Sequence, residues 1–448
     1  MFPVFSRSRL WALALSPVSI LALALIATAC GGEEEATDDL SDASLRPNAQ
    51  TPIIVPFSEP IVIGISAPLT GPDEALGTED RDAVIVGVEQ WKTANGDQIK
   101  GHDIEIRAED DGCTEADITV QAAERLLRRE GLVGVIGPNC SAGAQAAIPI
   151  YAQAGIVAIS GSATESDLAA GQPEGGFFFR TAYRNDLEGI LAGLFASVAL
   201  QAEKAYLIDD GELYGTDLAN AAQRALRDNN VVVTRESVRR GMVDFSELAA
   251  KIVSENPDLV GFAGFNPEAA LLYRQLRDAG YTGIFGSVDA AASVPSFVEP
   301  VGAAAEGVVF AGCSLTLPED FVADFQKVHG SKPEASAFVA QDADAATILL
   351  DAVAQVVEEQ PDGSLTIDPA ALRDAVRATT LEGGLSGSFA FDENGDRVPR
   401  QGDDLSQVVE EALSSGNIEI FVDLGLVPCQ VQDGKLVNLL GPGAGQIR

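Results

Sequence analysis

The feature that most constrains the fold is a regular alternation of short apolar runs with helix-patterned stretches, which begins at residue 61. Ile61–Ile65, Leu132–Ile136 and Leu259–Ala263 are such runs, and a stretch with apolar residues at helical spacing follows each of them. Strands that alternate with helices form parallel sheets with helices on both faces. Residues 61–448 exceed what one such sheet accommodates, so the sequence predicts an α/β protein with two lobes.

Local patterns predict several individual elements. Apolar spacing predicts a helix over Asp82–Asn95, and Thr114 stands where it can cap the next helix with Asp117 as its partner. Val231–Val233 is typical of a strand.

The C-terminal region also contains strand-like segments. They are Ile418–Val422 and Val431–Leu440, and the second is interrupted by Asp433 and Gly434, a pair that favours a tight turn.

The first thirty residues have the pattern of an export signal. Arg7 and Arg9 precede the apolar stretch 10–29, which ends in small residues before Cys30. This ending resembles a bacterial lipoprotein box, which predicts a signal peptide over 1–29 and a membrane anchor through acylated Cys30. The alternative is an uncleaved transmembrane anchor, and both place the remaining chain outside the cytoplasm. Residues 30–60 are acidic and rich in turn residues, which predicts a flexible tether.

Charge and motif content exclude several functional classes. The formal net charge of −38 repels phosphate backbones, so we expect no nucleic-acid partner. There are only two histidines, His102 and His329, and both are expected at the surface, which leaves little room for zinc hydrolase or Ser-His-Asp chemistry. GxSxG, HExxH and P-loop motifs are absent from the sequence. We therefore predict no catalytic residue, no metal and no cofactor, and a secreted enzyme is the least favoured function.

The remaining four cysteines are expected to pair in an oxidising compartment. Cys113 and Cys140 end the loops after two successive strands and so share one rim of the predicted sheet, which makes them the most natural disulfide. Cys313 and Cys429 then pair by elimination, or remain as free buried thiols.

Two loops of small residues are suited to hold a carboxylate. Gly137–Gly143 leaves a strand and opens a helix, and Ser160–Thr164 does the same after the next strand. Helix starts present unpaired N–H groups and a positive dipole end, which attract an anion. Ordinary turns and caps are the alternative interpretation of each loop taken alone.

The order of motifs over about residues 61–400 resembles the branched-chain amino-acid-binding proteins, which are type I periplasmic binding proteins of ABC importers. The matching stretches are Ile63–Pro72, the Cys113/Cys140 pair, Gly137–Ser141, Ser160–Thr164, Phe179–Thr181, Asp209–Gly215, Gly264–Glu268 and Phe391–Asp396. The resemblance implies two doubly wound parallel-sheet lobes joined by a three-crossing hinge. It places lobe I at 61–182 and 314–396, and lobe II at 183–313 and 397–448.

The resemblance also implies a role for individual residues. Ser141, Ser162 and Thr164 would hold the α-carboxylate of an amino acid. Tyr214 and Phe265 would cover the ligand from the second lobe, although the family often has tyrosine at the position of Phe265. Each of these two aromatics has a core or rim position as its alternative.

The other end of the ligand has two predicted contacts. Asp289 would pair with the ammonium group and is offset by one residue from the family pattern; a solvated loop acid is its alternative. Leu76 would line the side-chain end of the pocket or simply pack.

The implied function is capture of a small, apolar or branched-chain amino acid by closure of the two lobes. The implied partner is an ABC permease, and the chain would act as a lipid-anchored monomer. An uptake or sensor protein of the same fold for amides, urea or aromatic acids is the alternative. Gly402–Pro428 does not match the family pattern.

Overall fold

The computed structural model describes residues 48–172, 176–313, 317–333, 338–400, 407, 410, 415, 421 and 425–440. The predicted signal peptide 1–29, Cys30 and the first part of the predicted tether lie outside the described residues. Most of Gly402–Pro428 and of Ile418–Val422 lies outside them as well. No helix in the described part of the chain has the length and apolar character needed to cross a bilayer.

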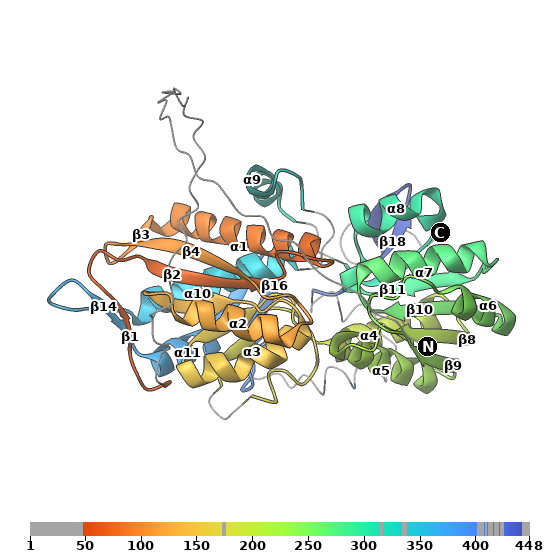
Figure 1. Ribbon diagram of the computed structural model, residues 1–448, viewed down its shortest axis with the longest axis horizontal. Coiled ribbons are helices and arrows are strands. Elements are labelled where there is room, and N and C mark those ends of the chain that lie inside the picture. The colour runs from red at the N-terminus through yellow and green to blue at the C-terminus, as the bar shows by residue number, and fades with distance from the viewer. Residues whose placement is uncertain are drawn as a thin grey trace, which may run out of the picture. The chain divides into compact units, whose positions relative to one another are not determined.

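The first lobe is built on a six-stranded sheet in the order β3-β4-β2-β5-β6-β7 (Figure 1). Its strands are β2 (Ile61–Ala67), β3 (Gln98–Ile99), β4 (His102–Asp110), β5 (Leu132–Ile136), β6 (Val157–Ser160) and β7 (Phe178–Arg180). Neighbouring strands are parallel except for the β3–β4 pair. Because β2 lies in the interior of the sheet, all seven of its residues are buried.

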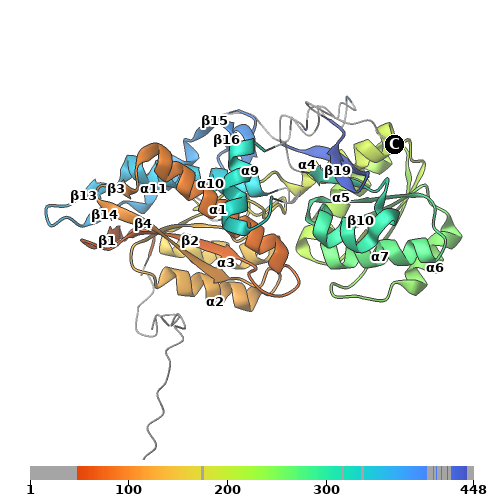
Figure 2. The ribbon, with the colours of Figure 1, turned by 90° about the horizontal axis from the view of Figure 1, so that it is seen from above.

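Helices cover both faces of this sheet (Figures 1 and 2). They are α1 (Glu74–Asn95), α2 (Ala116–Leu127), α3 (Ser141–Ala154), α9 (Glu319–His329), α10 (Val339–Val356) and α11 (Pro369–Arg377). α1 packs against α10, and α10 against α11, whereas α2 packs against α3. α9 lies on α1 through Phe321 and Phe325.

The second lobe has a seven-stranded sheet in the order β19-β18-β12-β11-β10-β8-β9. Its strands are β8 (Lys204–Asp209), β9 (Val232–Ser237), β10 (Leu259–Ala263), β11 (Ile284–Ser287), β12 (Val309–Cys313), β18 (Val427–Gln432) and β19 (Lys435–Asn438). The first five are parallel, and the C-terminal hairpin adds two antiparallel strands beside β12. Asp433 and Gly434 form its turn with φ values of 52° and 72°, as a two-residue hairpin requires.

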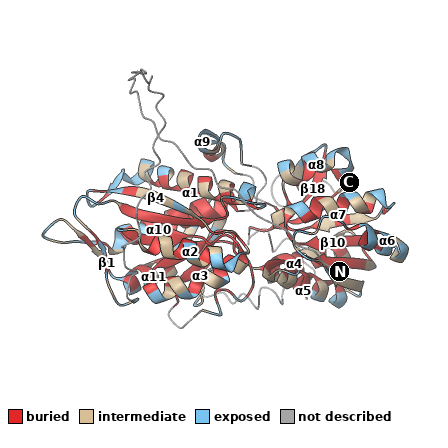
Figure 3. Cartoon of the chain, viewed as in Figure 1, coloured by how far each residue is buried: buried red, intermediate tan, exposed pale blue. Residues whose placement is uncertain are grey.

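The helices of the second lobe also occupy both sheet faces (Figure 3). They are α4 (Asn185–Leu194), α5 (Leu213–Asp228), α6 (Ser246–Glu255) and α7 (Asn266–Asp278), followed by the short α8 (Glu299–Val301). α4 and α5 pack together on one face, and α6 and α7 on the other. Each lobe therefore has its own apolar core, and the predicted α/β class with two doubly wound lobes is confirmed.

The described residues also form two small three-stranded sheets. One joins β1 (Ile53–Val55), β14 (Leu365–Ile367) and β13 (Glu358–Glu359), and the other joins β15 (Thr380–Gly384), β16 (Gly387–Phe391) and β17 (Arg397–Val398). Ile53 and Val55 are buried in the first core. The prediction that all of 30–60 is a flexible tether was therefore wrong for this strand, because its alternate residues pack.

Three further local predictions were wrong. The α1 helix begins at Glu74, ahead of the predicted Asp82. α2 begins at Ala116 without a side-chain cap, and the predicted Thr114–Asp117 pair does not form it. His102 is buried, because Nδ1 lies 2.7 Å from the Glu59 carbonyl and Nε2 lies 2.9 Å from that of Gly363.

Candidate functional site

The two loops predicted to hold a carboxylate are bound to each other at the edge of the first sheet. Ser160 Oγ donates to the Pro138 carbonyl at 2.7 Å, and Ser162 Oγ donates to the Asn139 carbonyl at 3.0 Å. The main-chain N–H of Glu165 donates to Ser141 Oγ at 3.1 Å. Parallel strands β5 and β6 end side by side, so the loops that follow them form one surface.

This surface retains donors for an anion. Ser141 opens α3, whose first N–H groups have no intrahelical acceptor. Because Ser141 Oγ accepts the bond from Glu165, its own hydrogen remains able to donate. Thr164 Oγ1 is fully buried and has no partner among the described residues. The hydroxyl of Ser162, by contrast, is already bound to Asn139.

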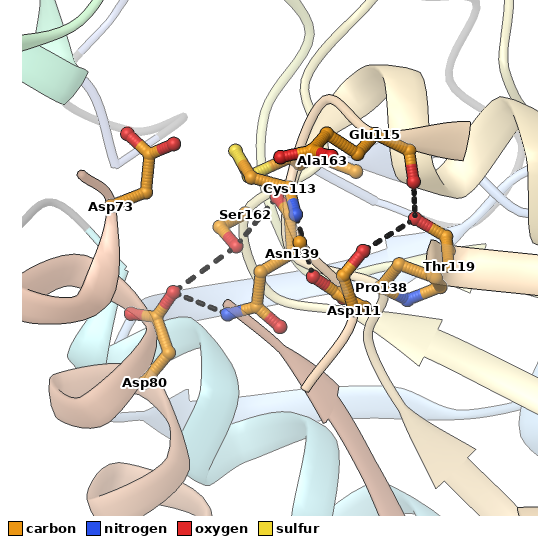
Figure 4. The surroundings of a disulfide bond; sticks show 12 residues. Asp73, Asp80, Asp111, Cys113, Glu115, Thr119, Pro138, Asn139, Ser162 and Ala163 are labelled. Atoms are coloured by element: carbon orange, nitrogen blue, oxygen red, sulfur yellow. Dashed lines mark hydrogen bonds between the residues drawn. A yellow bond between two sulfur atoms is a disulfide. The ribbon is translucent and has the colours of Figure 1, made fainter. Parts of the chain in front are cut away.

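The disulfide between Cys113 and Cys140 lies at the same edge (Figure 4). It packs against aromatic residues of the second lobe. Tyr214, in the first turn of α5, and Phe265, directly before α7, have ring centroids 5.1 Å apart. Both are buried in one apolar cluster with the disulfide. The structure also contains the second disulfide, Cys313–Cys429, which joins β12 to β18.

An acidic group lies on the second-lobe side. Asp289 is buried and accepts hydrogen bonds from the Tyr214 hydroxyl and, at 3.2 Å, from the Tyr183 hydroxyl. Its main-chain N–H donates to Glu188 Oε1 at 2.9 Å. Burial is the largest cause that raises the pKa of Asp289 from its ordinary value, and its hydrogen bonds oppose that effect. Asp289 is therefore built into the protein and is not a solvated loop acid.

A cavity of about 460 Å³ brings three of the predicted residues together, although they come from distant parts of the chain. Leu76, Phe265 and Asp289 all line it. Its wall also contains Asp73, Glu79 and His329, together with proline, alanine and serine residues. The described residues that line it include no lysine or arginine. Ser141, Ser162, Thr164 and Tyr214 do not line this cavity. Its volume exceeds that of a small amino acid, and its charge favours a ligand with a positive group.

A pair of buried acids, Asp80 and Asp342, lies beneath the loop surface of the first lobe. Asp80, on α1, accepts bonds from Asn139 and, at 3.4 Å, from Ser162 Oγ (Figure 4). Its side chain also interacts directly with that of Asp342, on α10. Burial raises the pKa of Asp80 to about 7, and burial together with the charge of Asp80 raises the pKa of Asp342 well above its ordinary value. Near neutral pH the pair therefore shares a proton.

This pair predicts a loss of stability with rising pH. The folded state binds more protons than the unfolded state, so the free energy of unfolding falls as pH rises from about 4 to about 7. In Asp342→Asn the amide can donate to Asp80, so no shared proton is needed. We expect this variant to be more stable than the wild type at pH 8 by on the order of 2 kcal/mol and to show a shallower pH slope in urea denaturation.

The exposed Asp278 at the end of α7 provides the control. Asp278→Asn should follow the wild-type pH profile. An Asp342→Asn profile that is parallel to the wild type would show that the pair does not bind the extra proton.

An ion pair connects the two sides of the cavity. Arg240 donates to both carboxylate oxygens of Asp73 at 2.5 and 2.7 Å, and its guanidinium lies 3.7 Å from the centroid of the Phe265 ring. Asp73 precedes α1 of the first lobe, whereas Arg240 follows β9 of the second. The Arg240 side chain is 12% exposed and the Asp73 side chain is 8% exposed, so water screens the pair little. The contact stabilises the arrangement in which the lobes meet.

We expect Arg240→Gln to weaken ligand binding moderately. The glutamine removes the ion pair and the cation–π contact, so the closed arrangement is less populated and the apparent affinity falls by about 10-fold. Isothermal titration calorimetry with leucine measures this change. Arg224→Gln, on α5, is a control that keeps the net charge of the variant. Equal affinity of Arg240→Gln and the control would contradict a role in closure.

Several residues of the site were missed from the sequence. Glu188 had a usable signal, because it is the one acid in the otherwise apolar stretch Leu187–Leu194. Tyr183, Asp73 and Arg240 had none, since each lies in a polar or mixed loop and is recruited by residues far away in the sequence.

Sequence comparisons relate the chain to known binding proteins. It is 34% identical over 230 residues to an amino acid binding protein of Pseudomonas aeruginosa, and the match spans 51% of this chain and 60% of that relative. It is 27% identical over 343 residues to a leucine-, isoleucine-, valine-, threonine- and alanine-binding protein of the same organism, covering 76% of this chain and 87% of the relative.

Solved structures share the fold. A leucine-binding protein from Thermotoga maritima superimposes with a TM-score of 0.68 at 24% identity, covering 84% of this chain and 97% of that one. A solute-binding protein from R. palustris in complex with benzoate gives a TM-score of 0.67 at 19% identity, covering 87% and 98%. The sequence profile described as "Periplasmic binding protein" matches residues 60–410. The predicted resemblance is confirmed, and the chain belongs to the periplasmic binding protein family.

Proposed function

We propose that the protein is an extracytoplasmic substrate-binding protein that holds a small apolar or branched-chain amino acid between its lobes and delivers it unchanged to an ABC permease. The observation that carries this proposal is the cavity in which Leu76, Phe265 and Asp289 meet. The aliphatic and aromatic residues of this wall suit an apolar side chain, and the buried carboxyl group of Asp289 suits an ammonium group.

The roles combine Asp289 and Phe265 of the cavity wall with the donors of the first-lobe loop surface, which lie outside that wall. The ligand carboxylate would accept bonds from Ser141, Thr164 and the first N–H groups of α3. The ligand's ammonium group would pair with Asp289. Tyr214 and Phe265, from the second lobe, would exclude water from the ligand. Ser162 would contribute through its main chain, because its hydroxyl is bound to Asn139.

The remaining parts of the proposal concern how the protein is presented. A signal peptide over 1–29, acylation at Cys30 and an acidic tether would hold a monomer at the membrane surface. Lobe I at 61–182 and 314–396 and lobe II at 183–313 and 397–448 would close about three crossings. The permease would recognise the closed form, so ligand binding would act by shifting an open–closed equilibrium.

A second candidate is uptake or sensing of an aromatic acid, amide or urea by the same fold. The benzoate-bound structure of similar fold favours it. The carboxylates of the cavity wall oppose an aromatic acid, since an anion would meet Glu79 and Asp289.

A thermal-shift screen distinguishes the two candidates. We expect leucine, isoleucine and valine to raise the melting temperature, because a ligand at 100 times its Kd stabilises the folded state by about 2.7 kcal/mol. Benzoate and urea at equal concentration should give no shift. Stabilisation by benzoate alone would support the second candidate and contradict the first.

A further inference from the structure

The acid of the second lobe is one of a pair. Glu188, on α4, is fully buried next to Asp289, and the two side chains interact directly in addition to the bond from Asp289 N–H to Glu188. Two carboxylates in contact in a buried site cannot both be ionised without a compensating cation. The pair therefore holds one proton in the protein without ligand.

Hydrogen bonding places this proton on Glu188. Asp289 accepts bonds from the hydroxyls of Tyr214 and Tyr183 and from its neighbour Ala290 N–H at 2.6 Å, and these donors stabilise its charge. Glu188 Oε2 is buried with no hydrogen-bond partner among the described residues. Burial first, and then the charge of Asp289, raise the pKa of Glu188 well above its ordinary value.

Among the described residues, no lysine or arginine forms an ion pair with either acid of the pair. Tyr183 and Tyr214 face it, and Arg397 acts on Tyr183 from β17. Gly312 of β12 closes the remaining side, because a Cβ there would lie 2.6 Å from Glu188 Oε1. In the described part of the chain neither carboxyl group forms an ion pair. A balancing charge would have to enter through the cavity that Asp289 lines.

We infer that the Glu188–Asp289 pair selects ligands with a cationic nitrogen and that binding such a ligand expels one proton from Glu188. This inference rests on the proposed function. The ammonium group docks on Asp289, and its positive charge stabilises a second carboxylate nearby. The Glu188 O–H bond breaks, the proton passes to solvent, and the new carboxylate keeps its bond from Asp289 N–H. The ammonium group then contacts Asp289, with the Glu188 carboxylate buried directly behind it. Neutral or anionic ligands gain nothing from the pair.

Calorimetry with leucine at pH 6.5 in two buffers of different ionisation enthalpy counts the released protons. We expect about one proton released per leucine bound. Below neutrality, the affinity should therefore increase about tenfold for each unit by which the pH is raised. Glu188→Gln should bind leucine with almost no proton release and little pH dependence. Asp278→Asn, at the exposed end of α7, is the control and should release the proton as the wild type does.

The outcomes distinguish failure of this inference from failure of the proposed function. Leucine binding by the wild type without proton release, or equal release by Glu188→Gln, overturns the inference and leaves the proposed function in place. Failure of leucine, isoleucine and valine to bind the wild type overturns both.

Discussion

Asp289→Asn is expected to weaken leucine binding by about 100-fold or more. Loss of one partner from a buried, hydrogen-bonded charge pair costs about 2–5 kcal/mol, because the other charge stays buried without compensation. The amide has one acceptor oxygen where the carboxylate uses two, one for Tyr214 and one for Tyr183. Titration calorimetry at pH 7 measures the change, and circular dichroism checks that the variant is folded.

The control for this experiment is an acid remote from the cavity. Asp228→Asn, at the exposed end of α5, changes the net charge by the same amount and should leave the affinity unchanged. If Asp289→Asn binds leucine as tightly as the wild type does, an ion pair between Asp289 and the ammonium group is ruled out. The aromatic-acid or amide candidate would then be favoured.

Removal of the Cys313–Cys429 disulfide is expected to lower the free energy of unfolding more than removal of the Cys113–Cys140 disulfide does. The two cysteines are 116 residues apart in sequence, and a cross-link of that span restricts the unfolded chain by about 5 kcal/mol. The Cys113–Cys140 bond spans 27 residues and contributes about 3.5 kcal/mol on the same basis. We expect the double variant Cys313→Ala/Cys429→Ala to unfold at a lower urea concentration than Cys113→Ala/Cys140→Ala.

The two double variants control for each other, because all four cysteines are buried and each pair loses two sulfur atoms. Their difference therefore reports the closed loop and not the lost packing. Equal or reversed stabilities would show that loop length does not govern the contribution of these bonds. The hairpin of β18 and β19 should also lose amide protection first in Cys313→Ala/Cys429→Ala, since this bond ties it to β12.

The fold could be predicted where buried faces are apolar. β2, β5 and β10 are continuous apolar runs, and their positions follow from the sequence. The start of α1 could not be predicted in this way, because its first turns bury Gly77, Glu79 and Asp80 in place of apolar residues. A Cβ at Gly77 would collide with the Pro68 backbone, so close approach of helix and loop determines that residue.

The site could be predicted in part for the same reason. Loops after successive parallel strands must lie side by side, which is why the prediction could group Ser141, Ser162 and Thr164. Which hydroxyls remain able to bind a ligand depends on bonds such as Ser162 to Asn139, and local sequence does not encode them. The partnership of Glu188 and Asp289 joins residues 101 positions apart, so only the folded chain shows it.

The measurement that most directly tests the account is a crystal structure of the protein grown with leucine. We predict one leucine between the lobes, with its ammonium nitrogen within hydrogen-bonding distance of Asp289 and its carboxylate at the start of α3 near Ser141 and Thr164. Leucine bound elsewhere, or lodged between the lobes with its carboxylate turned away from α3, would contradict it.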